Sequence, residues 1–153
     1  MPLTTVTGDP LLTRAQILAF GHNAKARSES GALATLLMQR YPTAFAAYRK
    51  QCRAGRIGPG DYWLCMETVP RLAFLIVRET AVGATRYRHV QSVALKLARD
   101  YRLLGIESLA IAPLARSDEW AALLPLWSQW FARTALPVTL YAAYAPGVEA
   151  EPE

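Results

Sequence analysis

The chain has 153 residues, 52% of them hydrophobic, which is enough for one compact core and short for two domains. Seventeen Lys and Arg residues outnumber twelve Asp and Glu residues, and this balance favours anionic partners such as nucleotides or nucleic acid, although a basic surface without a ligand would give the same composition. With only two Cys and two His residues, no set of metal ligands can be assembled by spacing, so neither a metal nor a cofactor is expected.

The sequence shows neither a secretory signal nor a membrane-spanning pattern. Its first ten residues lack a basic region followed by an apolar run, and no window approaches eighteen uncharged apolar residues. A cytoplasmic protein without a membrane partner is therefore expected. We expect residues 1–145 to form a single domain and residues 146–153, which are polar and acidic, to form a flexible tail.

Short apolar runs alternate with turn residues in the first part of the chain. A strand over residues 3–6 ends at a Gly-Asp-Pro sequence over residues 8–10, which favours a turn. We expect a short helical turn over residues 13–16 and then a buried strand over residues 17–20, whose exit over residues 21–23 is small and polar.

Helical and strand patterns alternate in the middle of the chain. After a polar loop, helical spacing of apolar residues begins at Ala32, is interrupted by Pro42 and ends near Gly55. Two successive strands over residues 62–66 and 72–77 are separated by a turn, which is consistent with a hairpin.

The next segment leads to a candidate site. A loop over residues 80–86 precedes an amphipathic helix over residues 87–104, after which Gly105 suits a left-handed helix cap. The apolar run over residues 109–112 shows no polar alternation, as is typical of a strand covered on both faces. Because ligands in open α/β sheets bind beyond the carboxyl ends of strands, the loop over residues 114–119 is the first place to look for a site.

The C-terminal part predicts a last helix over residues 120–134 and a last strand over residues 138–141. Pro125 fits this helix if it lies in the first turn. The order of strands and helices along the whole chain indicates an α/β protein, a three-layer α/β/α sandwich with a mixed central sheet.

Several short pieces of sequence, taken in their order and spacing, resemble a macro domain. They are Gly8-Asp9, Asn23, the GALA run over residues 31–34, Tyr41-Pro42, and the GIESLAI run over residues 105–111 with Pro113 after it. The resemblance covers nearly the whole chain and is nearest to the terminal ADP-ribose glycohydrolases and the DNA ADP-ribosyl glycohydrolase antitoxins. It implies a macro-domain-like fold and, as partner, ADP-ribose or a related nucleotide, free or carried by an ADP-ribosylated nucleic acid or protein.

The resemblance assigns Asp9 and Asn23 to two parts of such a ligand. In macro domains the aspartate after the first strand accepts a hydrogen bond from the adenine amino group, and Asn23 matches an asparagine near the distal ribose, whose hydroxyls suit an amide. An alternative stays open for each residue. Asp9 is also a suitable cap for a turn before Pro10, and Asn23 is also an ordinary polar residue at a strand exit.

Two loops are implied as the diphosphate site. In macro domains they are rich in glycine, whose exposed N–H groups approach the phosphates at the positive end of a helix. The matching residues here are Ser30, Gly31, Ala32, Leu114, Ala115 and Arg116. Only one of them is glycine, so fewer close backbone contacts are expected.

The catalytic residues implied by the resemblance are altered. In the glycohydrolase subgroup a lysine after the middle strand forms a covalent link to the sugar, whereas this sequence has Arg78, which stays protonated and is no amine nucleophile. Asp118 or Glu119 is a candidate for the acid of the late loop, and the alternative for each is an N-cap or first-turn carboxylate of the last helix.

Three functions stay open on these grounds. The first is a divergent macro domain that binds its ligand without turnover, which Asp9 and Asn23 favour. The second is an ADP-ribosyl glycohydrolase with a rearranged acid such as Asp118, against which Arg78 argues. The third is a structural or interaction protein with a degenerate pocket. The first two require the turns after the early strands and after Ile111 to meet at one mouth.

Overall fold

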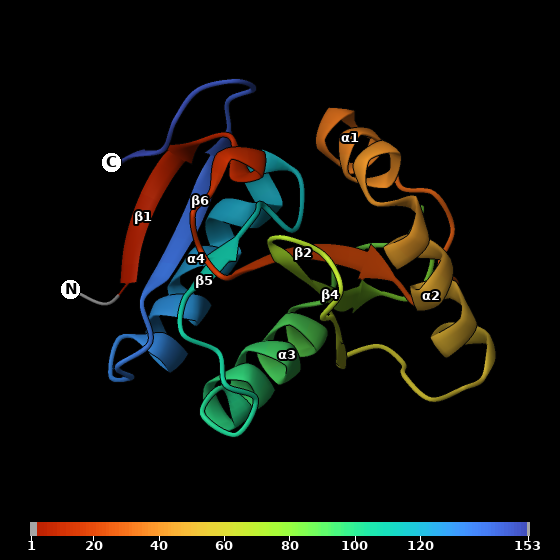
Figure 1. Cartoon of the computed structure of the whole chain (residues 1–153). Helices are drawn as coiled ribbons and strands as arrows, with labels where there is room; N and C mark the ends of the chain where they lie inside the picture. Colours follow the sequence, from red (N-terminus) through yellow and green to blue (C-terminus); the bar gives the residue numbers. More distant parts are fainter. Residues whose placement is uncertain (1–2, 153) are drawn as a thin grey trace.

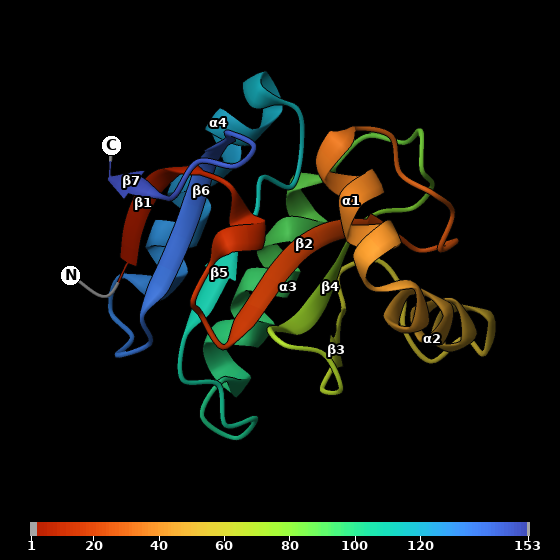
Figure 2. The same ribbon diagram turned by 45° about the horizontal axis from the view of Figure 1, so that its top comes forward.

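The computed structural model describes residues 3–152, whose strands form one sheet in the order β3-β4-β2-β5-β6-β1-β7 (Figures 1 and 2). The strands are β1 Leu3–Gly8, β2 Ile17–Asn23, β3 Tyr62–Cys65, β4 Arg71–Arg78, β5 Leu109–Ile111, β6 Val138–Tyr144 and β7 Glu151–Pro152. The inner strands β4, β2, β5, β6 and β1 run parallel to their neighbours, and β3 and β7 pair antiparallel at the two edges. The sheet is therefore mixed, as expected.

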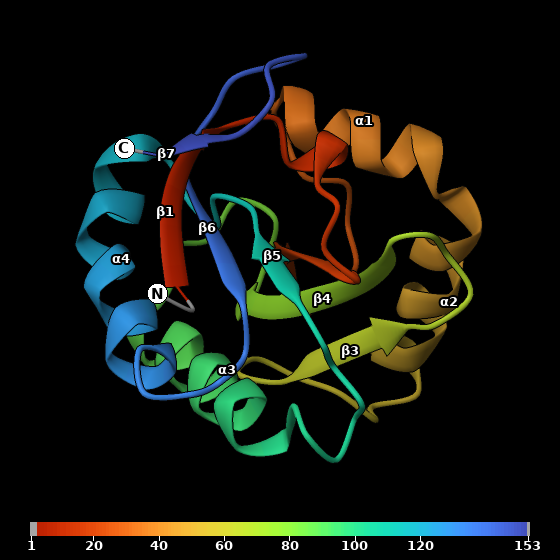
Figure 3. The same cartoon turned by 60° about the vertical axis from the view of Figure 1, so that its left-hand side comes forward.

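Helices cover both faces of this sheet, and Figure 3 shows the three layers. Helices α1 (Ala32–Arg40) and α2 (Pro42–Arg53) lie on one face, and α3 (Tyr87–Asp100) and α4 (Ser117–Phe131) lie on the other. A short 3-10 helix, η1 (Pro10–Leu12), connects β1 to β2. The expected α/β/α sandwich is confirmed.

The inner strands have continuous apolar sequences because both of their faces are buried. In β2, Ile17 and Ala19 pack on the side of α3 and α4, whereas Leu18 and Phe20 pack on the side of α1 and α2. All four side chains are at most 4% exposed. A strand with only one buried face would instead alternate apolar with polar residues.

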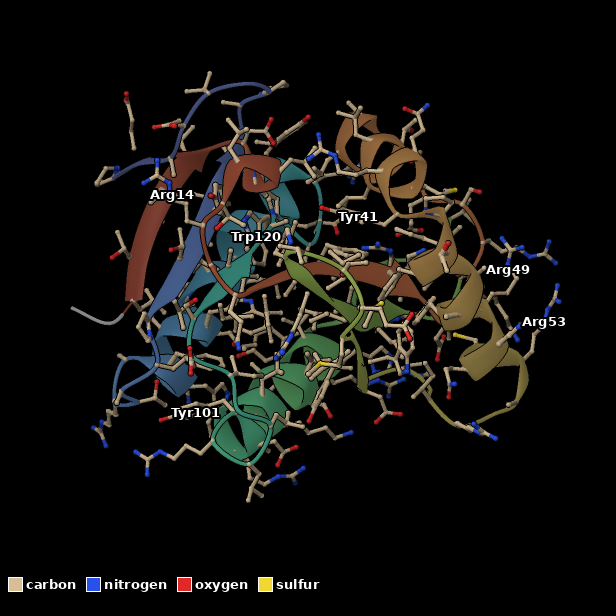
Figure 4. The ribbon with its side chains drawn as sticks, in the orientation of Figure 1. Arg14, Tyr41, Arg49, Arg53, Tyr101 and Trp120 are labelled. Atoms are coloured by element: carbon tan, nitrogen blue, oxygen red, sulfur yellow. The ribbon has the colours of Figure 1, made fainter. Side chains whose placement is uncertain are left out.

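The last helix differs from its expected position. α4 begins at Ser117 rather than at residue 120, so Pro125 lies inside the helix and not in its first turn. Proline removes one intrahelical hydrogen bond. Trp120 offsets this loss, because it is fully buried against the sheet and its indole Nε1 donates to the backbone oxygen of Tyr141 at 2.7 Å (Figure 4). Burial of the apolar face therefore decides where α4 runs.

The segment after β1 also differs from expectation. The helical turn is η1, not residues 13–16, because Asp9 caps it by accepting a hydrogen bond from the Leu11 backbone nitrogen at 2.9 Å. Pro10 supplies a favourable first helical residue. Residues 21–23, expected as the exit of the second strand, belong to β2 itself.

The C-terminal segment pairs with β1. β7 is antiparallel to β1, and the Gly147 nitrogen donates to the second carboxylate oxygen of Asp9 at 2.8 Å. The Asp9 nitrogen in turn donates to the Val148 oxygen at 2.7 Å. The acidic segment therefore covers the carboxyl-terminal end of the outer edge of β1, as Figure 2 shows. Glu153 lies outside the described residues.

The predicted hairpin is confirmed, because β3 and β4 pair antiparallel. Helix α3 ends at Asp100 rather than at residue 104, so Gly105, with φ of +69°, ends the turn that follows the helix instead of capping the helix itself. In residues 3–152, no helix combines the length and apolar character needed to cross a membrane.

Candidate functional site

A cavity of about 790 Å³ opens at the carboxyl ends of β2 and β4, beside the loop that follows β5. This volume lies within the range of small-molecule sites. Its walls come from the beginning of α1, residues 81–85, residues 113–116 and the first turn of α4. Figure 2 shows these segments at the same end of the sheet. The turns after β2 and β5 thus meet at one mouth, whereas the turn after β1 lies outside the cavity lining.

Two helices begin at this cavity. α1 starts after Gly31, whose φ of +107° favours glycine, and α4 starts after Arg116. Neither helix has a side-chain N-cap within the described chain, because Gly31 has no side chain and the Arg116 side chain forms no capping hydrogen bond. The first N–H groups of a helix have no intrahelical acceptor and carry partial positive charge. The cavity therefore contains donors suited to an anion.

The loop residues expected at the diphosphate do line this cavity. They are Ser30, Gly31, Ala32, Leu114, Ala115 and Arg116. Gly21 allows the second loop to approach, because a Cβ at this position would lie 3.1 Å from a Val77 methyl carbon and 3.2 Å from the Leu114 oxygen. A larger residue would push the loop away from β2.

Arg78 connects three loops of the cavity wall. Its guanidinium donates to the Thr85 hydroxyl at 2.9 Å and to the Leu114 backbone oxygen at 2.8 Å, and it forms an ion pair with Glu29. The side chain is only 13% exposed, and burial lowers the pKa of this arginine, which stays charged at neutral pH. A bulge at Val77 directly precedes it in β4. Arg78 therefore fixes the wall instead of presenting a free cation.

Asn23 uses its whole side chain inside the protein. The amide nitrogen donates to the Arg27 oxygen and to the Glu29 carboxylate, each at 2.9 Å. The amide oxygen accepts from the Lys25 and Arg27 nitrogens, each at 3.1 Å. Asn23 is fully buried and lies outside the cavity lining. It shapes the loop that carries Glu29.

His22 lies at the cavity wall and was not among the predicted site residues. Burial lowers its pKa to about 4, so the ring is neutral at pH 7. Its Nδ1 accepts a hydrogen bond from the Asn23 nitrogen at 2.8 Å, and we therefore place the ring hydrogen on Nε2. The ring packs against Phe45 and Tyr48 of α2.

The acidic candidates lie in different surroundings. Asp9 caps η1 and holds the C-terminal segment through its two oxygens, outside the cavity lining. Asp118 is exposed in the first turn of α4 and does not line the cavity. Glu119 does line it, and its carboxylate accepts from Arg116 at 3.2 Å. Within residues 3–152 no group of three or more His, Cys, Asp or Glu side chains is placed to hold a metal.

Sequence reasoning missed several wall residues, including Glu29, Thr85 and the loop over residues 81–84. The partner of Glu29, Arg78, lies 49 positions away in the sequence. Local patterns carry no signal for such a pair. Gly21 gave the clearest available signal, because a glycine within an apolar strand often marks a close approach of two backbones.

The described chain has parallel inner strands between two pairs of helices, with a cavity at the carboxyl ends of the strands. Solved structures show the same fold. No family model matches the sequence, and neither does any curated protein. The macrodomain of Thermus aquaticus DarG matches with a TM-score of 0.80 at 18% identity, covering 94% of this chain and 98% of that one.

Two further structures show the same relationship. The macrodomain of Mycobacterium tuberculosis DarG matches with a TM-score of 0.79 at 21% identity, covering 95% of this chain and 98% of that one. The structure of Thermosipho africanus DarTG in complex with ADP-ribose matches with a TM-score of 0.84 at 18% identity, covering 96% of this chain and 42% of that one. The chain therefore has a macrodomain fold, as the resemblance implied.

Proposed function

We propose that this chain binds ADP-ribose or a related nucleotide in its cavity and does not turn it over. The observation that carries the proposal is the convergence of two helix N-termini, α1 after Gly31 and α4 after Arg116, on one cavity. Backbone N–H groups at such ends suit a diphosphate. Structures of the same fold from Thermosipho africanus and Trypanosoma brucei are complexes with ADP-ribose, which supports this choice of ligand.

The diphosphate is placed between residues 30–32 and 114–116 in this proposal. Asp9 remains proposed for the adenine end, because each carboxylate oxygen has a second lone pair beyond the one used by Leu11 or Gly147. Asn23 is proposed to support the site without contacting the ligand, since the four hydrogen bonds of its amide hold the loop that carries Glu29. An ADP-ribosylated nucleic acid or protein would be recognised through the same group.

The absence of turnover is proposed from the state of the polar groups at the wall. Arg78 cannot act as an amine nucleophile, and its donors are engaged by Glu29, Thr85 and Leu114. Of the two acids considered from sequence, Asp118 does not line the cavity, and Glu119 lines it with its carboxylate paired to Arg116. No step of glycoside cleavage is therefore assigned to these residues.

Titration calorimetry with ADP-ribose at moderate salt tests the binding. Ser30→Asp adds a negative charge at the proposed diphosphate site, and we expect affinity to fall about tenfold or more through charge repulsion. Ser28→Asp is the matched control, since Ser28 is exposed and lies outside the cavity lining. No heat with the unmodified chain, or equal losses in both variants, would contradict the proposal.

A second assay tests turnover. The chain is incubated with ADP-ribosylated DNA, and free ADP-ribose is measured over time. We expect none above a reaction without protein. Steady release would identify a hydrolase and remove the non-catalytic part of the proposal while leaving the binding part intact.

A further inference from the structure

The net positive charge of this protein is concentrated in one part of the chain. Residues 30–60 contain five basic side chains and no acidic one. The other twelve basic residues are balanced by the twelve acidic ones, so this segment accounts for the whole excess of +5. It forms α1, α2 and the turn after α2. One side of the molecule therefore carries an unbalanced positive field.

Part of this charge forms a defined surface on α2. Arg49 and Arg53 are one helical turn apart on one face, and Figure 4 shows both extending from α2 into solvent. Lys50 and Arg56 flank them, and all four side chains are exposed. None of the four forms an ion pair with another described residue. These residues, together with Arg27, are called here the α2 basic surface.

The absence of acidic residues from residues 30–60 distinguishes the α2 part of this surface from the rest of the chain. Elsewhere, Lys96 pairs with Asp61 and Arg116 pairs with Glu119. Cations near a helix C-terminus are favourable in themselves, which accounts for the sign of the charge at Arg53. It does not account for Arg49 and Arg53 facing each other at i and i+4, an arrangement that destabilises an isolated helix slightly.

The α2 basic surface begins at the wall of the cavity. Arg27 and Arg49 line a small hollow between the loop after β2 and α2. His22, Met38 and Phe45 line both this hollow and the main cavity. A polymer lying on the basic side chains would therefore pass beside the cavity without entering it.

We propose that the α2 basic surface binds the phosphodiester backbone of a nucleic acid. Arginine predominates in it, and the planar guanidinium suits phosphate oxygens. A lipid surface is disfavoured, because no large hydrophobic side chain between residues 37 and 65 is exposed, and a helix that lies in a membrane interface needs an apolar face. This inference is independent of ADP-ribose binding, since no residue of the α2 basic surface lines the main cavity.

Fluorescence anisotropy with a labelled, unmodified 20-nucleotide single-stranded DNA tests the inference on the full chain. Arg49→Glu/Arg53→Glu removes the centre of the surface. Arg14→Glu/Arg133→Glu is the matched control, because it changes the net charge equally at two exposed positions, and Figure 4 shows Arg14 on the far side of the molecule from α2. Circular dichroism and thermal unfolding check the fold, and Arg49→Gln/Arg53→Gln serves if the first variant does not fold.

We expect DNA binding by the unmodified chain, at least tenfold weaker binding by the α2 variant and a much smaller change in the control. The slope of log affinity against log salt should fall by roughly 1.4 for two phosphate contacts to a single strand. No binding by the unmodified chain, or equal weakening in both variants, would overturn the inference. Comparable binding to vesicles that contain an anionic lipid, measured by sedimentation, would also overturn it in favour of a membrane surface.

Discussion

The guanidinium of Arg78 donates to the backbone oxygen of Leu114 at 2.8 Å, and this bond ties the end of β4 to the loop after β5. The same group holds Glu29 and Thr85. One side chain thus fixes the relative positions of three loops around the cavity. Preorganisation of this kind lowers the conformational cost of ligand binding.

Arg78→Lys should therefore weaken both the fold and ligand binding. A lysine keeps the charge, but its compact ammonium cannot span three partners. We expect the free energy of unfolding to fall by about 2–3 kcal/mol, as for a lost charge-assisted hydrogen bond. Urea unfolding and calorimetry with ADP-ribose measure the two effects. Arg99→Lys, at an exposed pair with Asp100, is the control and should change neither. Equal changes in unfolding free energy and in ADP-ribose affinity for the two variants would show that Arg78 does not hold the cavity wall.

Gly21→Ala should widen the gap between β2 and the loop over residues 113–116. The added Cβ would lie 3.2 Å from the Leu114 oxygen, and overpacking of this kind costs roughly 1–3 kcal/mol. We expect a lower melting temperature and a several-fold weaker affinity for ADP-ribose. Gly58→Ala is the control, because a Cβ at position 58 would have no neighbour within 4 Å among the described residues. An unchanged affinity of Gly21→Ala for ADP-ribose would show that the loop over residues 113–116 is not part of the binding site.

His22 should make stability depend on pH on the acid side of neutrality. Its pKa is lowered from 6.5 to about 4 by burial, so unfolding takes up a proton between these values and stability falls as the pH is lowered through this range. His22→Gln should show a shallower fall between pH 6.5 and 4. His89→Gln is the comparison, since this half-buried ring is the only other histidine in the sequence. If the melting temperature falls equally between pH 6.5 and 4 in His22→Gln and in the unmodified chain, this assignment is contradicted.

Asp9→Ala should affect stability and adenine recognition separately. Loss of the cap on η1 and of the bond from Gly147 should cost about 1–2 kcal/mol. We expect calorimetry to show a lower affinity of Asp9→Ala for ADP-ribose, because the contact with adenine is lost. The affinity for ribose 5-phosphate, which lacks the base, should stay the same. Equal losses for both ligands would leave Asp9 with a structural role alone.

The fold could be predicted from the sequence because the inner strands are continuous apolar runs and the helices have clear amphipathic spacing. The errors arose where tertiary contacts override local signals. Pro125 suggested a later start for α4, but burial of Trp120 places the proline inside the helix. The bond between Gly147 and Asp9 also has no local signal, because it joins residues more than 130 positions apart.

The site could be predicted only in part, for a related reason. The loops around Gly31 and Ala115 were found because they follow strands, and strand ends of a parallel sheet share one edge. The engagement of Arg78 by Glu29 and the saturation of the Asn23 amide could not be found, since each depends on how a loop folds back. Residue type and spacing indicate which groups lie near a site, but not which of them already have hydrogen-bond or ion-pair partners within the protein.

Strand β7 has a consequence for self-association. The outer edge of β1 would otherwise offer unpaired backbone groups, which act as a template for strands from other molecules. Pairing with residues 151 and 152 closes this edge beside Val6 and Thr7. Proteolytic removal of the acidic segment should therefore produce soluble aggregates, detectable by light scattering, before it produces loss of the native sheet.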